Sequence, residues 1–488
     1  MSQINVQNLT FAYEGSYDNI FEDVSFAFDT DWKLGFVGRN GRGKTTFLRL
    51  LMGELGVQTS ISSPVACTYF PYAVEDEEAN TEDLIERLCP EAQPWQWQRE
   101  CRLLELTDDI FYRPFNTLSN GERTKVLLAA LFVREERFLL IDEPTNHLDA
   151  AAREAVARYL NTKKGFLLVS HDRRFLDGCV DHILALNRTG IQVTKGNFST
   201  WFANKERQEA FERGENEKLQ SEIKRLAGAA RRTAGWSEEV ESTKIGQGIY
   251  DRGAVGHKAA KMMKRAKAIE NRRQAAVEDK QKLLRDVEYA LPLKISPRVH
   301  HANVLIEARG LNIAYGEHTV AENVSFTLHQ GEHIALAGRN GCGKSSILKL
   351  IVGEDIPHSG TLRMASGLTI SYVSQDMSFL SGDLTQYAEE LRIDRTLFMT
   401  ILRKLNFQHE HLEKDMHTLS MGQKKKVLLA GSLAAQAHVY VWDEPFNYVD
   451  VYSRIQVEEL ICKFRPTMLL VEHDAMFLEM IDAKVVKL

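Results

Sequence analysis

Four short motifs occur twice in this chain, in the same order and at a spacing of about 300 residues. A shared offset across four motifs means that one unit of roughly 190 residues is used twice, so any fold for the chain must build the same unit two times. The four pairs are FVGRNGRGKTT (36–46) with LAGRNGCGKSS (336–346), LSNGE (118–122) with LSMGQ (419–423), FLLIDEPTNHLD (138–149) with VYVWDEPFNYVD (439–450), and VSHD (169–172) with VEHD (471–474).

The composition fits an ordinary globular protein. Of 488 residues, 44% are hydrophobic and 26% are charged. No run approaches the roughly 18 apolar residues of a membrane span, and the start MSQINVQNLTFAYEG lacks the basic segment and apolar core of a signal peptide. The six cysteines are scattered without a CxxC pair, which favours free thiols over a disulfide or zinc framework. We therefore expect a soluble cytoplasmic protein.

Each repeat opens with the P-loop pattern G-x-x-x-x-G-K-[ST], between a short apolar strand and a helix-forming segment. Glycines let backbone N–H groups turn toward phosphates, and the helix adds its positive end. We expect the lysine to reach the outer phosphates and the next hydroxyl to bind Mg²⁺. A glycine-rich turn without function is the alternative, which context and duplication disfavour. The nucleotide-binding candidates are Gly38, Asn40, Gly41, Gly43, Lys44, Thr45 and Thr46, and Gly338, Asn340, Gly341, Gly343, Lys344, Ser345 and Ser346.

Each repeat also places Asp-Glu-Pro after an apolar run that reads as a buried strand. We expect Asp142 and Asp443 to hold the Mg²⁺ shell beside the P-loop, and Glu143 and Glu444 to polarise the attacking water by accepting its proton. A surface acidic turn before the proline is the alternative. Its recurrence in both repeats argues for the catalytic interpretation.

A histidine follows another apolar strand in each repeat, His171 after GFLLV and His473 after TMLLV. Alone, such a residue is more often a core or strand-end histidine. Because both repeats carry it at the same offset, we interpret it as a γ-phosphate contact that positions the water and the glutamate.

This set of motifs resembles the ATP-binding cassette ATPases. The order of P-loop, LSxGx, DEP and xHD covers both repeats, roughly 380 of the 488 residues. In that family two cassettes sandwich two ATP molecules head to tail. The resemblance implies ATP and Mg²⁺ as cofactors, an α/β fold with two P-loop cassettes, and pairing of the two cassettes within one monomer. One site would combine Lys44 with LSMGQ, and the other Lys344 with LSNGE.

The resemblance also assigns residues outside the P-loops. Small signature glycines let the backbone approach the γ-phosphate beside a helix start. An aromatic in the matching FAY and IAY contexts would stack on adenine, although a strand-pairing aromatic is the alternative. The residues implied are Ser119, Gly121, Ser420 and Gly422 in the signatures, Tyr13 and Tyr315 as the aromatics, and Gln375 as a further Mg²⁺ ligand.

Two departures from the family pattern set the repeats apart. Tyr72 stands where the second repeat has Gln375, and a tyrosine cannot ligate Mg²⁺ in the same way. Tyr448 stands where the first repeat has His147. We therefore expect unequal hydrolysis at the two sites.

A basic segment joins the repeats. From Ile223 to Arg273 there are thirteen Lys or Arg and five Asp or Glu, a surplus of eight positive charges in a chain of net charge −6. Two helical seams flank a glycine-rich region that begins at Gly235, which predicts an antiparallel helical hairpin with its cations outside or at the tip. Such a hairpin suits an RNA-rich partner, whereas a solvated charged linker is the simpler alternative. The RNA-contact candidates are Trp236, Lys244, Ile249, Tyr250, Arg252, Lys258, Lys261, Lys264, Arg265 and Lys267.

Two cassettes with such a linker resemble the ABC-F family of translation factors, with domains expected at 1–203, 204–291 and 292–488. The first helical subdomain lacks the arm insertion of housekeeping members. The segments DRGAVGHKAAKMMKRAKAIENR, WSEEVESTKIG, LSNGE and DEPFNYVDVYSRIQVEELI are similar to the antibiotic-resistance branch of Lsa and Vga type. The resemblance implies ATP-dependent binding to the E site of the 70S ribosome. The linker tip would displace lincosamides, pleuromutilins or streptogramin A through P-site tRNA and 23S rRNA.

Three other functions stay open at this point. A translation factor could resolve stalled ribosomes without drug protection. A tandem-cassette ATPase of a membrane importer would have a short neutral linker and a membrane partner, and the basic hairpin argues against it. DNA repair or chromosome maintenance would need zinc fingers or much longer coiled coils.

Overall fold

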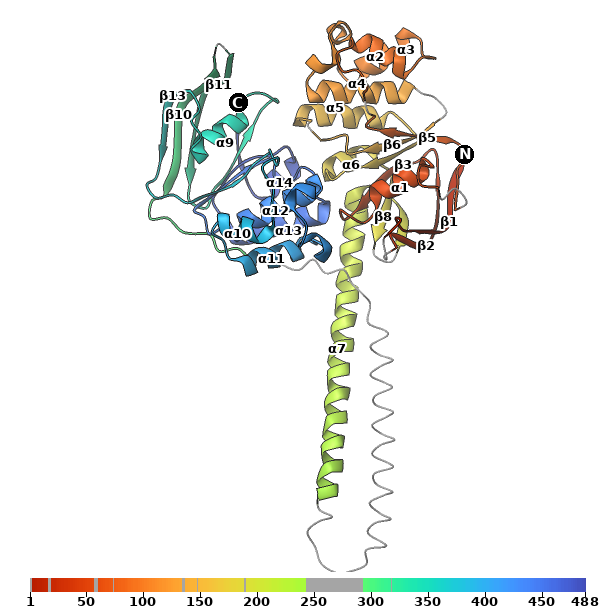
Figure 1. Ribbon diagram of the computed structural model, residues 1–488, viewed down its shortest axis with the longest axis vertical. Coiled ribbons are helices and arrows are strands. Elements are labelled where there is room, and N and C mark those ends of the chain that lie inside the picture. The colour runs from red at the N-terminus through yellow and green to blue at the C-terminus, as the bar shows by residue number, and fades with distance from the viewer. Residues whose placement is uncertain are drawn as a thin grey trace, which may run out of the picture. The chain divides into compact units, whose positions relative to one another are not determined.

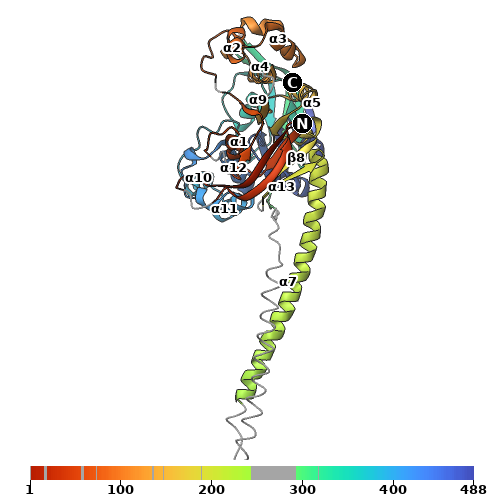
Figure 2. The ribbon, with the colours of Figure 1, turned by 90° about the vertical axis from the view of Figure 1, so that its right-hand side faces the viewer.

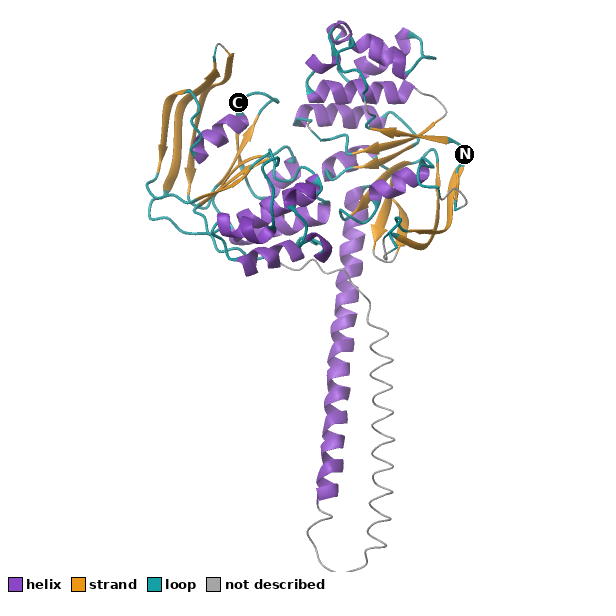
Figure 3. Cartoon of the chain, in the orientation of Figure 1, coloured by secondary structure: helices purple, strands orange, loops and turns teal. Residues whose placement is uncertain are grey.

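The computed structural model describes residues 2–15, 19–56, 60–72, 74–133, 137–146, 148–187, 190–242, 293–316 and 318–488, and within 225–242 the backbone alone. The chain divides into two compact units, Met1–Trp201 with Ala290–Leu488, and Phe202–Tyr289. The first unit holds both repeats, and each repeat combines two sheets with surrounding helices (Figures 1 and 3).

A six-stranded sheet forms the core of the first repeat. The strand order is β5-β6-β7-β3-β8-β9, and only the β8–β9 pair is antiparallel. The interior strands are continuous apolar runs such as FLLI because both faces of a parallel sheet are covered. The strands are β3 (Lys33–Gly38), β5 (Ala66–Phe70), β6 (Arg137–Asp142), β7 (Phe166–Val169), β8 (His182–Asn187) and β9 (Gly190–Lys195).

The second repeat has the same arrangement in a five-stranded sheet of order β14-β15-β16-β12-β17, in which every pair is parallel. Each repeat adds a three-stranded antiparallel sheet, of order β2-β1-β4 in the first and β11-β10-β13 in the second. The strands are β12 (His333–Ala337), β14 (Ile370–Val373), β15 (Val439–Asp443), β16 (Met468–Val471), β17 (Lys484–Lys487), β1 (Gln3–Phe11), β2 (Phe21–Asp29), β4 (Ile61–Ser62), β10 (Val304–Tyr315), β11 (His318–His329) and β13 (His358–Met364).

Helices occupy matching places in the two repeats. One helix follows each P-loop, one follows each DEP motif, one follows each xHD histidine, and three form a small helical subdomain in each repeat. In that order they are α1 (Lys44–Leu51) and α9 (Lys344–Val352), α5 (Ala150–Asn161) and α13 (Val451–Phe464), α6 (Arg173–Cys179) and α14 (Ala475–Met480), then α2 (Thr81–Leu88), α3 (Pro94–Leu103) and α4 (Asn120–Val133) with α10 (Leu384–Glu390), α11 (Arg395–Lys404) and α12 (Met421–Ala434). The predicted α/β fold of two P-loop cassettes is confirmed.

A single long helix, α7 (Phe198–Ser242), leads out of the first repeat (Figure 2). It confirms the first helix of the predicted hairpin but corrects its turn, because Gly235 and Trp236 lie inside the helix rather than in a turn region. An interior glycine costs a helix only about 1 kcal/mol, and the neighbouring alanine, arginine and glutamate residues are good helix formers. The second helix of the hairpin falls at 243–292, outside the described residues.

None of the helices that the structure describes is long and apolar enough to cross a membrane.

A buried ion pair anchors the segment between β15 and α13. Asp450 is fully buried and caps α13 by accepting a hydrogen bond from Ser453 N at 3.0 Å, while its Oδ2 lies 2.7 Å from Nζ of Lys426 on α12. Burial alone would raise the pKa of Asp450, but the charge and hydrogen bond of Lys426 outweigh it and hold that pKa well below its usual value. The resulting stability is fully present above the unfolded pKa of about 4 and is lost as the pH falls through the folded pKa.

We expect Asp450→Asn to lower the free energy of unfolding by about 3 kcal/mol at neutral pH, because the Lys426 ammonium stays buried without its counter-charge. Asp149 is the matching cap in the first repeat, where it accepts from Ala152 N at 2.9 Å and is only half-buried. Asp149→Asn should change that free energy by less than about 0.5 kcal/mol, since asparagine caps a helix as well as aspartate does. Denaturant titration compares the two variants, and equal losses would contradict the assigned role of the ion pair.

Candidate active sites

The candidate residues of each repeat lie at one edge of its parallel sheet. In the first repeat the P-loop follows β3, the DEP motif follows β6 and the histidine follows β7, and β7 lies between the other two strands. The second repeat uses β12, β15 and β16 in the same way. Because the carboxyl ends of neighbouring parallel strands meet at one edge, residues far apart in sequence converge there.

The first P-loop contains a glycine at which any side chain would be strained. Gly43 has φ +97°, and a Cβ on it would lie 2.4 Å from Cγ2 of Ile20. The buried Lys44 follows, and its Nζ donates to Gly38 O at 2.7 Å and to Asn40 Oδ1 at 3.2 Å. The Lys44 ammonium therefore folds back onto its own P-loop and is held there by these two hydrogen bonds.

The second P-loop repeats this geometry. Lys344 Nζ donates to Gly338 O and Arg339 O, both at 2.9 Å. A cavity of about 300 Å³ opens beside it. Its lining includes one residue of the first repeat's signature segment, Asn120, so both repeats contribute to it. The lining residues are Asn120, Val320, Asn340, Gly341, Gly343, Lys344, Ser345, Ser346, Gln375 and Glu444.

The predicted Mg²⁺ ligands are brought together in both repeats. Thr45 Oγ1 lies 3.5 Å from Asp142 Oδ2. In the second repeat Ser345 is hydrogen-bonded to Asp443, whose other carboxylate oxygen Oδ1 is buried without a hydrogen-bond partner in the described part of the chain. Hydroxyl and carboxylate oxygens are the hard donors that Mg²⁺ prefers. Burial raises the pKa of Asp443 to about 6, which a bound cation would reverse.

Sequence reasoning missed one partner of the first-site aspartate. The hydroxyl of Tyr69, on β5, donates to Asp142 Oδ2 at 3.0 Å. Burial, and next the charge of Asp142, raise the pKa of Tyr69, so it remains a donor. Tyr72, noted from sequence at the place of Gln375, packs its ring edge-on to Phe70 with centroids 6.2 Å apart. The spacing from β5 to the expected glutamine position was the signal that could have pointed to this strand end.

The glutamate and histidine of each repeat face one another. Glu143 Oε1 lies 3.2 Å from Nε2 of His171, and Glu444 Oε1 lies 3.7 Å from Nε2 of His473. Both glutamates have positive φ, +49° and +46°, an uncommon conformation for a non-glycine residue. Gln375 Nε2 also donates to Glu444 Oε2 at 2.8 Å.

The two glutamates differ in their ionisation. Burial, reinforced by the charge of Asp142, raises the pKa of Glu143 to about 8. Burial acts in the same direction on Glu444, but the neighbouring His473 imidazole and the charges of Lys425 and Lys344 outweigh it and lower the pKa of Glu444 below its ordinary value. Burial, followed by the charge of Lys44, keeps the pKa of His171 well below the usual histidine value. The second site therefore holds the more readily ionised base.

The two predicted adenine-stacking tyrosines lie beside the P-loops with their rings largely exposed. Tyr13 OH is 3.1 Å from Thr46 Oγ1, and Tyr315 OH is 3.1 Å from Ser346 Oγ. Tyr13 is 41% exposed and Tyr315 is 48% exposed, so each ring leaves a face open that a base can cover.

The signature segments begin helices, as predicted. Ser420 caps α12, with its Oγ accepting from Gln423 N and the Gln423 side chain accepting from Ser420 N. Ser119 and Glu122 make the same reciprocal pair at the start of α4. Each signature therefore lies at a helix N-terminus, where backbone N–H groups and the helix dipole favour a phosphate.

The first P-loop meets the second signature directly. Asn40 Nδ2 donates to Tyr448 O at 2.7 Å, and a Cβ on Gly422 would lie 2.9 Å from the same nitrogen. A cavity of about 60 Å³ remains there, lined by Asn40 and Gly41 from one repeat and Ser420 and Gly422 from the other. At the matching Gly121, a Cβ would lie 3.6 Å from Cδ2 of Leu148, which is an ordinary van der Waals contact. His147 lies outside the described residues.

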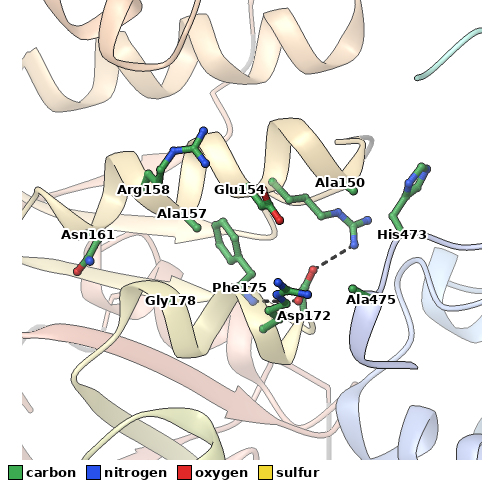
Figure 4. A pocket seen from close by; sticks show the side chains of 12 residues that line it. Ala150, Glu154, Ala157, Arg158, Asn161, Asp172, Phe175, Gly178, His473 and Ala475 are labelled. Carbon is green, nitrogen blue, oxygen red and sulfur yellow. Dashed lines mark hydrogen bonds and ion pairs between the residues drawn. The ribbon is translucent and has the colours of Figure 1, made fainter. Parts of the chain in front are cut away.

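A third cavity between the repeats has no P-loop residue in its lining (Figure 4). It measures about 340 Å³ and is lined by α5 and α6 of the first repeat together with His473 and Ala475 of the second. Arg153 donates to Asp172 at 3.1 Å on its wall. Close by, Arg173 of the first repeat donates to the buried Glu458 of the second at 2.5 Å.

The RNA-contact candidates of the linker lie beyond what the structure describes. Only the backbone of Trp236 is described, within α7. The others, Lys244, Ile249, Tyr250, Arg252, Lys258, Lys261, Lys264, Arg265 and Lys267, lie outside the described residues.

Comparison with known proteins matches both repeats to one family model, described as ABC transporter, over residues 21–146 and 321–447. The chain is 29% identical over 477 residues to the ribosome protection protein VmlR of Bacillus subtilis strain 168, which covers 96% of this chain and 84% of that protein. It is 26% identical over 519 residues to the energy-dependent translational throttle protein EttA of Haemophilus influenzae, covering 95% of this chain and 88% of that protein.

Among solved structures, the archaeal ribosome recycling factor aABCE1, in complex with the ribosomal stalk protein aP1, is similar with a TM-score of 0.60. The sequence identity is 21%, with 94% of this chain and 84% of that chain covered. At this identity the likeness shows the fold alone.

The unequal glutamates predict unequal pH profiles. In Glu444→Gln the turnover reports on the first site, and we expect it to rise between about pH 7 and 9 because Glu143 must lose a proton before it can accept one. In Glu143→Gln the second site reports, and its turnover should stay nearly constant over that range because Glu444 is already ionised. Phosphate release measured across pH tests both variants, and superimposable profiles would rule out the assigned difference.

Proposed function

We propose that this chain, an ATPase that belongs to the ABC transporter family and to its ABC-F group, binds the ribosome in its ATP state and leaves after hydrolysis. The observation that carries this proposal is the similarity to a ribosome protection protein over 96% of the chain, which includes the basic linker as well as the cassettes. A ribosomal site of action also supports the cytoplasm as the compartment of the chain.

The geometry supports two composite ATP sites. Lys44 and Lys344 would bind the outer phosphates, and each signature helix start would add backbone N–H groups from the other repeat. Bound Mg²⁺, held by Thr45 with Asp142 or by Ser345 with Asp443 and Gln375, would neutralise phosphate charge. Because each site needs both repeats, ATP binding would hold them together and hydrolysis would release them.

Within a site, the residues of this chain would act on the attacking water. Glu143 and Glu444 would accept its proton, and His171 and His473 would hold the glutamate and the γ-phosphate in place. The distances of 3.2 and 3.7 Å between glutamate and histidine support this pairing. Tyr13 and Tyr315 would cover the adenine.

The finer proposal is that the chain protects the ribosome from antibiotics at the peptidyl-transferase centre. The linker would enter from the E site, with its tip displacing lincosamides, pleuromutilins or streptogramin A through P-site tRNA and 23S rRNA. The surplus of eight positive charges between Ile223 and Arg273 supports RNA as the surface that it contacts. The two aromatic candidates of the linker, Trp236 and Tyr250, would stack on unpaired bases.

A second candidate function is a translation factor that acts on stalled ribosomes without drug protection. The similarity to a translational throttle protein over 95% of the chain favours it. Both functions use the same ATP sites and the same ribosomal partner, so they differ only in what the linker tip does.

The first test is ribosome binding. Glu143→Gln with Glu444→Gln should trap the ATP-bound chain on 70S ribosomes, because ATP binds but its hydrolysis is slowed by a factor of roughly 100 or more. Co-sedimentation through sucrose in ATP and in ADP measures this, with Lys44→Ala and Lys344→Ala together as the control that should not bind ATP. Recovery of the trapped variant in the supernatant in ATP would sink the ribosomal proposal.

The second test separates the two candidate functions. Expression of the chain in a sensitive bacterium should raise the inhibitory concentration of a lincosamide or pleuromutilin by about fourfold or more, a shift that corresponds to roughly 1 kcal/mol in drug binding. The Glu143→Gln, Glu444→Gln chain at equal abundance serves as the control. Unchanged inhibitory concentrations with intact ribosome binding would favour the translation factor.

A further inference from the structure

Two buried positions carry charges in the second repeat and none in the first. Lys425 on α12 stands where the first repeat has Thr124, and Glu472 after β16 stands where it has Ser170. Lys425 is 1% exposed and Glu472 is 4% exposed. Burying a lysine or glutamate side chain costs free energy unless the charge is paired and hydrogen-bonded. We therefore expect these two side chains to make contacts that the first repeat does not make at the matching positions.

Lys425 joins two strand ends of the second site. Its Nζ donates to Ser374 O at 3.0 Å and to Asp443 O at 3.3 Å. Ser374 directly precedes Gln375, and Asp443 directly precedes Glu444. The Lys425 ammonium therefore binds the carbonyl groups of the residues that immediately precede Gln375 and Glu444.

The first repeat has no such bridge at the matching position. Thr124 Oγ1 donates to Asn120 O at 2.8 Å, within its own helix. Ser170 accepts a hydrogen bond from Asp172 N at 3.2 Å, the place where Glu472 accepts from His473 N at 2.7 Å and Asp474 N at 3.3 Å.

The charges around Lys425 come from two neighbouring strand ends. Asp443 and Glu444 follow β15, Glu472 follows β16, and all three attract the ammonium. Lys425 and Lys344 together act on the Glu444 carboxylate from two sides, α12 and α9. The Glu444 carboxylate is therefore stabilised by a lysine of the signature helix as well as by the P-loop lysine.

We propose that Lys425 is a positioning residue for ATP hydrolysis at the second site. Bound to Ser374 O and Asp443 O, it fixes the segments that present Gln375 and Glu444, and it places a lysine charge where the first repeat has Thr124. Glu472 balances this charge and holds the backbone of His473. The inference rests on the proposed base role of Glu444 and is independent of the ribosomal partner.

Single-turnover hydrolysis of bound ATP tests the proposal, because it counts chemistry at one site without product release. Lys425→Met is placed in the Glu143→Gln chain, where the second site reports, and in the Glu444→Gln chain, where the first site reports. We expect a loss of about tenfold in the first background and less than about twofold in the second, with the ATP concentration dependence shifted less than about twofold in both.

The first-site readout separates positioning from a general structural defect. The cap residue of α12, Ser420, lines the cavity at the first P-loop, so a distorted α12 would slow the first site as well. Equal losses in both backgrounds, or no loss in either, would overturn the proposal. Thr124→Met is the matched control, and it should change neither rate by more than about twofold.

A paired variant guards against misfolding of the single one. Lys425→Thr with Glu472→Ser removes both buried charges and recreates the residues of the first repeat, so it leaves no unpaired charge behind. It should show the same loss of about tenfold at the second site. If Glu444→Gln leaves second-site hydrolysis intact, the base assignment itself fails, which is a different outcome from an unchanged rate in Lys425→Met.

Discussion

The side chain of Asn40 is the contact on which the first site depends. Its Nδ2 donates to Tyr448 O of the other repeat at 2.7 Å, and its Oδ1 accepts from Lys44 Nζ and lies 3.2 Å from His171 Nε2. A single amide therefore links the phosphate lysine, the histidine and the opposite repeat. Because an amide is a donor on one side and an acceptor on the other, neither aspartate nor leucine could make this set of contacts. This contact therefore joins the second repeat to the first P-loop.

The sites are unequal because their buried charges differ. Around Glu143 burial prevails and its pKa rises to about 8, whereas at Glu444 the surrounding cations and His473 prevail and its pKa falls. The departures at Tyr72 and Tyr448 in the sequence predict unequal hydrolysis at the two sites. The structure adds a difference in the groups that surround the two glutamates. At Glu444 burial is outweighed by His473 first and by Lys425 and Lys344 next, whereas at Glu143 the charges of Arg454 and Lys44 do not outweigh burial.

Local patterns predicted what depends on local sequence. The P-loops, the DEP strands and the signature helix starts lie where the motifs placed them, because each is encoded by adjacent residues with one backbone requirement. The bond from Tyr69 to Asp142 and the bridge by Lys425 could not be predicted, since both depend on which strand ends and helices become neighbours. The turn expected at Gly235 was wrong because flanking helix-forming residues outweigh one glycine. The role of the linker cations stays a prediction.

Helix α12 has residues at both sites, and in this respect the two repeats are not equivalent. Its start, at Ser420 and Gly422, packs against the first P-loop, and about one and a half turns later Lys425 binds the strand ends of the second site. At the matching position of α4, Thr124 donates within its own helix instead of to the strand ends. Both α12 contacts lie on one short helix, so a displacement of α12 at the first P-loop would also displace Lys425. Linkage makes such coupling reciprocal for binding. We therefore expect nucleotide at the second site to affect nucleotide binding at the first through α12.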